Sequence, residues 1–439
     1  MALSSIPRVS PKSIEYVKKV LDRGIHNARN SGLDAELEKK FAERFGQQYG
    51  ILMSNGTVTM QAALMASDIG VGDEVIVPAF TVFMTAGAAL FANAIPIVAD
   101  VDPDTWTLDP KDVERKITSR TRAIIPVSIC GLSPDMDPIL RLAKEHNIVV
   151  IEDNAQCFLG YYKERVVGSM GDFSSFSFQG SKHMTCGEGG ILLCKNEETA
   201  TKARKASSLG FSSLTAEPGN STIPKELRCH PSFQRHTSYG HNFLLSELAI
   251  ALALGEFERI DELVSIRQEA AREFESVVAG CDWLIPQNTP KDYVHSYWTY
   301  AMRMIRDDIE WSEMRRFFVS LGGDGYYAAY QPVHREPIFP MLSDLVKSNP
   351  DRFPHWSGKM PDYRETSCPV WESIQPYIIM LKTKYFSLDC ARQQADTRRS
   401  ARIGVASQAL SILSLRSQHR TRSLPCPRDL SLRSRISVL

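Results

Sequence analysis

The sequence lacks the patterns that identify secreted, membrane-spanning or metal-binding proteins. Its nine cysteines occur singly, with no Cys-x-x-Cys pair and no spacing typical of metal ligands. An odd number of scattered cysteines is typical of reduced thiols inside a cell. No apolar run approaches the ~20 residues of a membrane span, and the N-terminal segment has no apolar core of signal-peptide length. These absences predict a soluble cytoplasmic protein that holds no metal and binds no membrane.

The nucleotide-binding fingerprints are also missing. No glycine-rich loop ends in Gly-Lys-Ser/Thr, which excludes a P-loop enzyme. Gly70-Val71-Gly72 has no third glycine in place and precedes an apolar run, so it is no dinucleotide fingerprint. A nicotinamide-dependent enzyme is therefore disfavoured. No segment has a helix-turn-helix pattern that would indicate a transcription factor.

Net charge is absent too: 51 Lys plus Arg balance 51 Asp plus Glu in 439 residues. The balance hides two unequal parts. Residues 396–439 contain nine Arg, nine Ser, no Lys and no aromatic residue, and their net charge of +7 leaves −7 on residues 1–395. The mildly acidic body gives no support for nucleic-acid binding. We interpret 396–439 as an atypical, poorly packed tail of separate origin. A basic arm that binds an acidic surface is the alternative.

What the sequence does contain is a regular alternation of strand and helix patterns. Short apolar runs rich in β-branched residues, which suit buried strands, occur at 49–54, 74–79, 95–101, 121–129, 148–155, 173–178 and 189–194. Amphipathic helical patterns, such as 57–68 and 136–146, lie between them. This alternation predicts an α/β fold with a largely parallel sheet.

The second half of the chain is predominantly helical in pattern. We expect helices at 197–209, 243–279 (in two pieces) and 311–320, a strand at 295–305, and loops at 212–238 and in the Pro-rich segment 338–370. The composition and pattern predict a large domain over 1–255 and a smaller C-terminal α/β domain over 256–395.

Two segments follow predicted strands and could contact a ligand. Asn55-Gly56-Thr57 joins a strand to a helix, where unpaired N–H groups and the positive helix end attract an anion. Asp153 ends the run at 148–155, and ligands gather at the carboxyl ends of parallel strands. Taken alone, the first is most simply a capped turn and the second a helix-capping aspartate.

The third segment is FSFQGSKHMTCGEGG at 176–190. Most lysines are solvated, but Lys182 stands among glycines and serines that allow backbone and ligand to approach closely. A desolvated lysine has a lowered pKa and attacks carbonyls. An anion cradle, a strand-end Asp and a buried Lys, in this order, are what pyridoxal 5'-phosphate (PLP) requires.

These residues resemble the DegT/DnrJ/EryC1/StrS family of PLP-dependent sugar aminotransferases. The similarity covers about residues 10–395 and is strongest at IEDNAQ (151–156) and at FSFQGSKHMTCGEGGILL (176–193). It implies the fold type I, aspartate aminotransferase-like architecture, with a large, mostly parallel seven-stranded sheet domain and a smaller C-terminal α/β domain. It also implies a homodimer with shared active sites.

The resemblance assigns a role to each matching residue. Lys182 would bind PLP covalently and act as the acid/base, Asp153 would pair with the pyridinium nitrogen, and Gln156 would lie near the ring hydroxyl. The phosphate would be held by Gly56, Thr57, Ser177 and, from the neighbouring subunit, Asn242. His334, Tyr330 and His295 occur in segments that line the substrate mouth in the family.

One departure concerns the aromatic residue that family members usually place after the Thr of the PxxT segment. This chain has Val82 there, so Phe80, Phe83 or an aliphatic surface would contact the ring. The resemblance predicts transfer of an amino group from glutamate or glutamine to a keto-sugar, either nucleotide-linked or a cyclitol. A PLP-dependent sugar dehydratase or lyase, or a catalytically silent PLP-binding regulatory homologue, is the alternative. Related dehydratases have His where this chain has Lys182.

Overall fold

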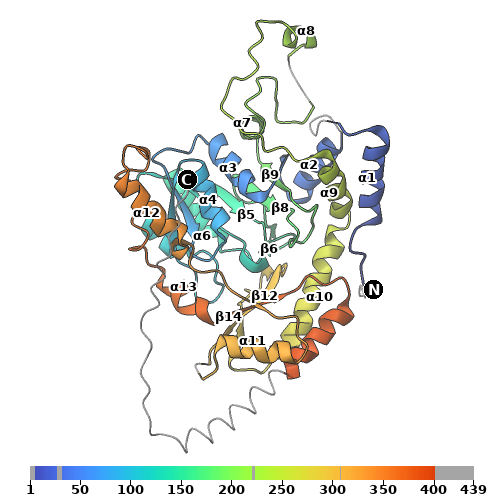
Figure 1. The fold of residues 1–439 in the computed structure, drawn as a ribbon, viewed down its shortest axis with the longest axis vertical. Helices are drawn as coiled ribbons and strands as arrows, with labels where there is room; N and C mark the ends of the chain where they lie inside the picture. The colour runs from blue at the N-terminus through green and yellow to red at the C-terminus, as the bar shows by residue number, and fades with distance from the viewer. Residues whose placement is uncertain (1–4, 27–31, 220–222, 307, 401–439) are drawn as a thin grey trace, which may run out of the picture.

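The structure, a computed structural model, describes residues 5–26, 32–219, 223–306 and 308–400. The tail expected over 396–439 falls almost wholly outside these residues. Figure 1 shows a large sheet with helices on both faces, a small sheet below it, and α10 running between the two parts. No helix of the described residues is long and apolar enough to cross a membrane.

The large sheet has seven strands in the order β1-β9-β8-β5-β4-β2-β3. They are β1 (Tyr49–Met53), β2 (Glu74–Pro78), β3 (Ile95–Ala99), β4 (Thr121–Ile124), β5 (Val149–Asp153), β8 (Phe173–Ser177) and β9 (Gly190–Cys194). Strands β3, β2, β4, β5 and β8 pair in parallel, and β9 pairs antiparallel with both of its neighbours. The predicted seven-stranded, mostly parallel sheet is confirmed.

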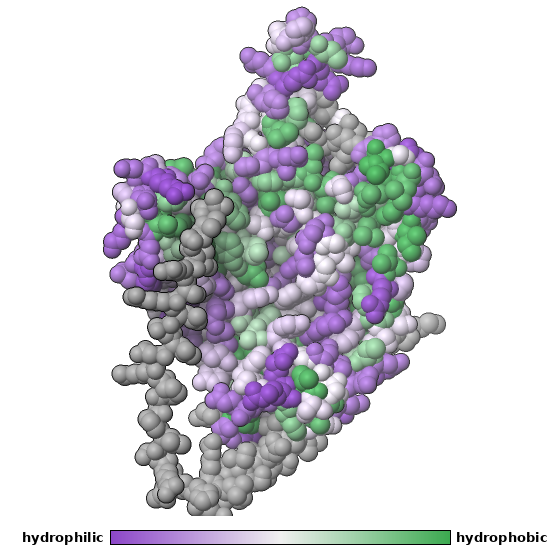
Figure 2. Space-filling view, in the orientation of Figure 1, coloured by the Kyte–Doolittle hydropathy of each residue, from purple (hydrophilic) through white to green (hydrophobic). Residues whose placement is uncertain are grey.

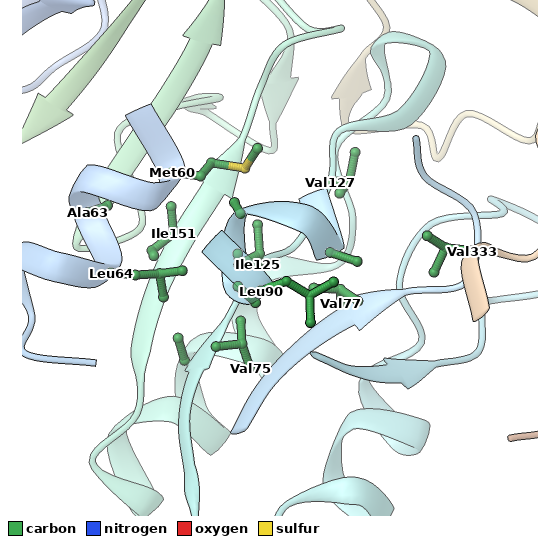
Figure 3. Close-up of a cluster of buried hydrophobic side chains, with 14 of the residues drawn as sticks. Met60, Ala63, Leu64, Val75, Val77, Leu90, Ile125, Val127, Ile151 and Val333 are labelled. Atoms are coloured by element: carbon green, nitrogen blue, oxygen red, sulfur yellow. The ribbon is translucent and has the colours of Figure 1, made fainter. Parts of the chain in front are cut away.

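Helices cover both faces of this sheet because apolar side chains alternate between the two faces along its strands. The helices that precede α10 are α1 (Pro11–Arg23), α2 (Leu33–Arg44), α3 (Gly56–Ala66), α4 (Phe83–Phe91), α5 (Pro110–Lys116), α6 (Met136–His146), α7 (Glu197–Ser207), α8 (Lys225–Arg228) and α9 (Glu247–Phe257), and all but α8 belong to the body of the large part. Val75 and Val77 face α3 and α4, whereas Ile76 packs with residues of α5 and α6. Figure 3 shows the first cluster, with Leu64 of α3 beside β2 and β5.

The small sheet has the order β10-β12-β14-β13 and is antiparallel throughout. Its strands are β10 (Leu284–Pro286), β12 (Thr299–Met304), β13 (Tyr327–Ala328) and β14 (Ile378–Lys382). It packs against α10 (Ile260–Val278) and α11 (Trp311–Ser320), and a third sheet joins β6 (Tyr161–Tyr162), β7 (Arg165–Val166) and β11 (Tyr293–Val294). Residues 388–400 are helical, so this helix continues past 395, where we expected the small domain to end.

The segment 338–370 is not the loop that its prolines suggested. It contains α12 (Ile338–Ser348), and α13 (Pro369–Ile374) begins at its end. Pro340 lies in the first turn of α12 and Pro369 is the first residue of α13. Proline is tolerated there because the first N–H groups of a helix have no partner within the helix. The segment 212–238 is largely irregular as expected and forms an arm that carries α8 away from the body (Figure 1).

Candidate active site

Asp153 lies at the carboxyl end of β5 and is 3% exposed. Its Oδ2 accepts a hydrogen bond from Thr85 Oγ1 of α4 (2.9 Å), and Oδ1 accepts one from the Ala155 amide (3.2 Å). The preceding residue, Glu152, faces the opposite side of the sheet because side chains alternate along a strand. Its carboxylate accepts three backbone N–H bonds from 168–171. Only Asp153 therefore faces the candidate site.

The turn before α3 brings Gly56 close to β8. A Cβ on Gly56 would lie 3.0 Å from Ser177 Cβ, and a Cβ on Gly190 would lie 2.9 Å from the Gly56 nitrogen. Asn55 caps the helix by accepting from the amides of Thr57 (3.1 Å) and Val58 (3.0 Å). The glycines therefore allow a close approach of three segments, and the positive end of α3 opens beside Ser177. An anion here would meet the Gly56 amide and the hydroxyls of Thr57 and Ser177.

Lys182 lies in the loop that follows β8, and buried Arg267 of α10 holds this loop in place. The Arg267 guanidinium donates to the carbonyl oxygens of Ser181 (2.9 Å) and Lys182 (2.7 Å). Trp298 Nε1 also donates to the Ser181 carbonyl (3.1 Å), while the Lys182 ammonium lies 4.9 Å from the centre of the Trp298 ring. The lysine therefore extends over an aromatic face from a backbone fixed at two carbonyls.

Burial makes Lys182 easier to deprotonate and Asp153 harder to ionise than the same groups are in water. Desolvation lowers the pKa of Lys182 to about 8; the charge of Asp153 raises it and that of Arg267 lowers it. Burial also raises the pKa of Asp153, although Thr85, Ala155 and Lys182 pull it down. Lys182 and Asp153 interact electrostatically and so belong to one site. A second cation beside Asp153 would stabilise its ionised form.

Gln156 and Asn242 approach the site from different sides. Gln156 is buried, and its Oε1 accepts from the Cys130 amide (2.8 Å), which leaves the amide nitrogen as the end that can donate to a ligand. Asn242 is exposed and forms an isolated β-bridge with Ser208 at the foot of the arm. The neighbouring Phe243 carbonyl accepts from the Ser54 amide (2.8 Å), so the chain at 242 runs beside the candidate anion turn.

The three expected substrate contacts do not gather in one place. Tyr330 lines a cavity next to Lys182, together with Ser181 and Trp298. His334 is 1% exposed and bonds to Glu372 Oε1 (3.1 Å). His295 is 5% exposed, accepts from the Tyr297 amide (2.9 Å) and stacks on the Tyr297 ring. Both histidines thus have internal partners.

Neither phenylalanine suggested as a ring-stacking residue is free to take that role. Phe80 is fully buried and stacks on Trp371 with ring centres 3.9 Å apart. Phe83 packs edge-on against Phe339 at 5.9 Å. Of the surfaces suggested for the ring, this leaves the aliphatic one; Val82, at the start of α4, is partly buried.

Sequence reasoning missed Arg267, Trp298 and Thr85. A signal for Arg267 was present, because this arginine interrupts the apolar face of α10 between Ile266 and Ala270. A charged residue on a buried helix face must find polar partners, here the backbone of the Lys182 loop. Thr85 and Trp298 carry no comparable signal, since such residues are common in helices and strands.

The large sheet and the helices that cover it form the fold type I, aspartate aminotransferase-like architecture. The sequence model of the DegT/DnrJ/EryC1/StrS aminotransferase family matches residues 7–374. The chain belongs to this family and is an aminotransferase, as the resemblance predicted.

Similar proteins and solved structures support this assignment. The chain is 32% identical to "GDP-perosamine synthase" of Escherichia coli O157:H7 over 344 residues, which is 78% of this chain and 88% of that protein. It is 32% identical to "Putative L-glutamine:3-amino-2,3-dideoxy-scyllo-inosose aminotransferase" of Streptoalloteichus tenebrarius, over 79% of this chain and 82% of that protein. An aminotransferase structure from Psychrobacter cryohalolentis superposes with a TM-score of 0.77 at 25% identity, over 92% of this chain and 99% of that one.

Proposed function

We propose that this chain is a PLP-dependent aminotransferase that moves an amino group from glutamate or glutamine to a keto-sugar. The observation that carries the proposal is that desolvated Lys182 and buried Asp153 interact electrostatically, with Asp153 at the carboxyl end of the central strand β5. The names of two relatives support these small-molecule substrates: one is named a GDP-perosamine synthase, and the other is named for L-glutamine and an amino-dideoxy-scyllo-inosose.

The residues present fit PLP. Asp153 is a buried carboxylate whose raised pKa marks the need for a cationic partner, such as the N–H of a pyridinium ring. The Gly56 turn offers the helix end that a phosphate prefers, and Ser177 lies directly beside it. Gln156 has an amide nitrogen to donate to a ring oxygen. Bound PLP would supply the electron sink for charge that develops at the substrate Cα.

In the proposed reaction the chain's own groups bind, orient and move protons. Lys182 would hold the cofactor covalently between turnovers. Its free amine would take a proton from the Cα of the amino donor in one half of the reaction and give a proton to the acceptor carbon in the other half. Its pKa of about 8 suits this exchange near neutral pH. Arg267 and Trp298 hold the Lys182 loop by donating to its backbone carbonyls, and this keeps the amine in position. Asp153 supplies the negative charge of the site.

We also infer that the enzyme works as a homodimer in which Asn242 contacts the cofactor phosphate of the partner subunit. Asn242 is exposed in the single chain. Apolar Ile14 and Leu21 of α1, and Ile25 just after its end, are each more than half exposed, and Figure 2 shows a hydrophobic patch in that region. Light scattering on the purified protein should give twice the chain mass, and a monomer would contradict the shared site.

The experiment for the whole proposal is a coupled amino-transfer screen with ¹⁵N-labelled glutamate and glutamine across keto-sugars and inososes. Wild-type protein with PLP should show visible cofactor absorption and a ¹⁵N-labelled amino sugar. Lys182→Ala should lose covalent cofactor absorption and transfer. Lys182→Arg, which keeps the charge but cannot attack the carbonyl, should also be inactive. Full transfer by Lys182→Ala would overturn the proposal. Formation of a deoxy-sugar without nitrogen would favour the dehydratase alternative.

A further inference from the structure

His183, the residue after Lys182, connects the Lys182 loop to a segment 113 residues further along the chain. Its Nε2 lies 2.9 Å from the carbonyl oxygen of Ser296, shortly before β12. A ring nitrogen at this distance from a carbonyl oxygen can only donate to it, so Nε2 carries the proton. The side chain is 3% exposed, and its ring packs against Phe158 with ring centres 5.4 Å apart. The hydrogen bond therefore lies inside the protein, where water does not compete for it.

His183 is neutral and offers a single donor. Burial and the positive charge of Arg267 hold the pKa of His183 well below its usual range. Its Nδ1 is buried and has no hydrogen-bond partner among the residues that the structure describes. A protonated ring would place an N–H there without an acceptor, and a second positive charge beside Lys182. The polar contribution of this side chain is therefore its one bond to Ser296.

The segment that ends in Trp298 holds the Lys182 loop at two points. Trp298 Nε1 donates to the Ser181 carbonyl (3.1 Å) just before the lysine, and the Ser296 carbonyl accepts from His183 just after it. Lys182 thus lies between two bonds to the same segment, and both help to set the direction in which its side chain leaves the backbone. Loss of the second bond would remove the side-chain contact on the C-terminal side of the lysine.

Ser296 also connects this loop to Gln156. The Ser296 amide donates to the Gly131 carbonyl (2.9 Å), and the Cys130 amide donates to Gln156 Oε1 (2.8 Å). Cys130 has a φ of 59°, and a Cβ on Gly131 would lie 2.6 Å from the Tyr297 nitrogen. A left-handed conformation in a residue other than glycine persists where its surroundings hold it in place. One serine therefore contacts both the lysine loop and the turn that holds Gln156.

We propose that His183 is a positioning residue for Lys182, and that its bond to the Ser296 carbonyl sets where the lysine amine meets the cofactor carbonyl. The inference rests on the proposed function, because it concerns the capture of PLP. Attack on a carbonyl requires close alignment of the two reacting atoms, so a small displacement of the amine slows it. Affinity for the cofactor before the covalent bond forms depends instead on Asp153 and the turn at Gly56.

Substitutions of His183 separate this role from packing. His183→Gln places an amide N–H close to the position of Nε2, whereas the shorter amide of His183→Asn lies at the position of Nδ1 and does not reach Ser296. His183→Leu fills the space without a donor. The rate of PLP capture by the full-length apo-protein, followed by absorbance, should fall about tenfold in the Asn and Leu variants, as expected for one lost buried hydrogen bond. His183→Gln should recover most of that rate.

Two further measurements distinguish a positioning role from a general structural one. Pyridoxamine phosphate has an amine in place of the carbonyl and forms no bond to Lys182, so its affinity should stay close to wild type in all three variants. Thr185→Val is the matched control. Thr185 Oγ1 donates to the Phe178 carbonyl (2.8 Å) and accepts from the Gly187 amide (3.0 Å), both within the same loop. Its loss should leave PLP capture close to wild type.

The proposal is wrong if His183→Leu captures PLP as fast as wild type, or if His183→Gln is as slow as His183→Leu. It is also wrong if Thr185→Val slows capture equally, because general loosening of the loop would then explain the effect. If affinity for pyridoxamine phosphate falls in parallel with capture, His183 shapes the whole cofactor site and not the lysine alone, which also contradicts the proposal. If His183→Leu does not fold, as measured by Tm, the Gln and Asn variants decide. A wild-type protein that captures no PLP would instead contradict the proposed function.

Discussion

At the candidate site, some residues supply charge and others hold the charged residues in position. Asp153 and Lys182 carry the charges that matter, while Thr85 and Arg267 hold them where they are. The two kinds of role respond differently to substitution. Loss of a charge changes what the site can stabilise, whereas loss of a positioning contact changes how often the correct geometry is present.

Asp153→Asn keeps the shape and a hydrogen-bond partner for Thr85 but removes the negative charge. We expect weaker PLP binding and a fall in turnover of about 10²–10³-fold, because the charge that favours a protonated ring nitrogen is lost. Thr85→Val, which leaves the charge and removes only the 2.9 Å hydrogen bond, should have a smaller effect. Cofactor titration and steady-state rates measure both, and an Asp153→Asn enzyme as active as wild type would contradict the assigned role.

The lowered pKa of Lys182 predicts how cofactor capture depends on pH. Only the neutral amine attacks a carbonyl, so the rate of PLP capture by the apo-protein should rise with pH and level off above about 8. Arg267→Gln removes a positive charge that lowers this pKa, so the midpoint should move to higher pH. Arg267→Lys keeps the charge and should keep the midpoint, while the rate falls at every pH because the two-carbonyl contact is lost. If the pH midpoint of PLP capture were the same in Arg267→Gln and Arg267→Lys, the charge of Arg267 would not affect Lys182, and its role would be purely structural.

At the scale of elements, α2, β1 and α7 are tied together by one buried ion pair. Arg204 of α7 donates to Glu38 Oε2 of α2 (2.7 Å) and to the Gly50 carbonyl of β1 (3.1 Å). Glu38 Oε1 also accepts from the Leu52 amide (2.9 Å). Burial raises the pKa of Glu38 while Arg204 opposes that rise, so the carboxylate depends on its partner.

Arg204→Met should therefore destabilise the large domain by about 3–5 kcal/mol, because it leaves a buried carboxylate unpaired. Adding Glu38→Gln should recover part of that loss. Arg44→Met, which breaks the exposed pair with Asp261, is the control and should cost no more than about 1 kcal/mol. Urea unfolding gives the three values, and a double variant less stable than Arg204→Met would argue against coupling.

The secondary-structure elements also show which parts of the fold could be predicted from the sequence and which could not. The seven large-sheet strands were predictable because each is a short apolar run between helix patterns. Helix α12 was missed because the prolines of this segment were interpreted as signs of a loop. Pro340 lies in the first turn of the helix, where proline is tolerated. The strand β14 was missed because Ile378–Lys382 joins partners more than 70 residues away in β12. Within the site, local motifs marked Lys182 and Asp153, but the burial of His334 and His295 depends on distant packing.

At the scale of the whole molecule, the helical residues 388–400 pack against the core of the small domain. Arg398 is 7% exposed, with its guanidinium 3.9 Å from the centre of the Phe274 ring of α10 and 5.3 Å from that of Phe318 of α11. Its Nη2 also lies 3.4 Å from Asp324 Oδ1. The first residues past 395 thus cover the core of the small domain.

Two truncations separate these residues from the rest of the tail. A chain ending after Ser400 keeps Arg398 and should match the full chain in Tm and in amino transfer. A chain ending after Ala395 loses a buried cation–π contact of about 2 kcal/mol, so its Tm should fall by about 4–8 °C. Arg398→Ala in the full chain should reproduce most of that fall. If the chain ending after Ala395 melted like the full chain, Arg398 would add nothing to the small domain. A loss of transfer in the chain ending after Ser400 would instead give residues 401–439 a functional role.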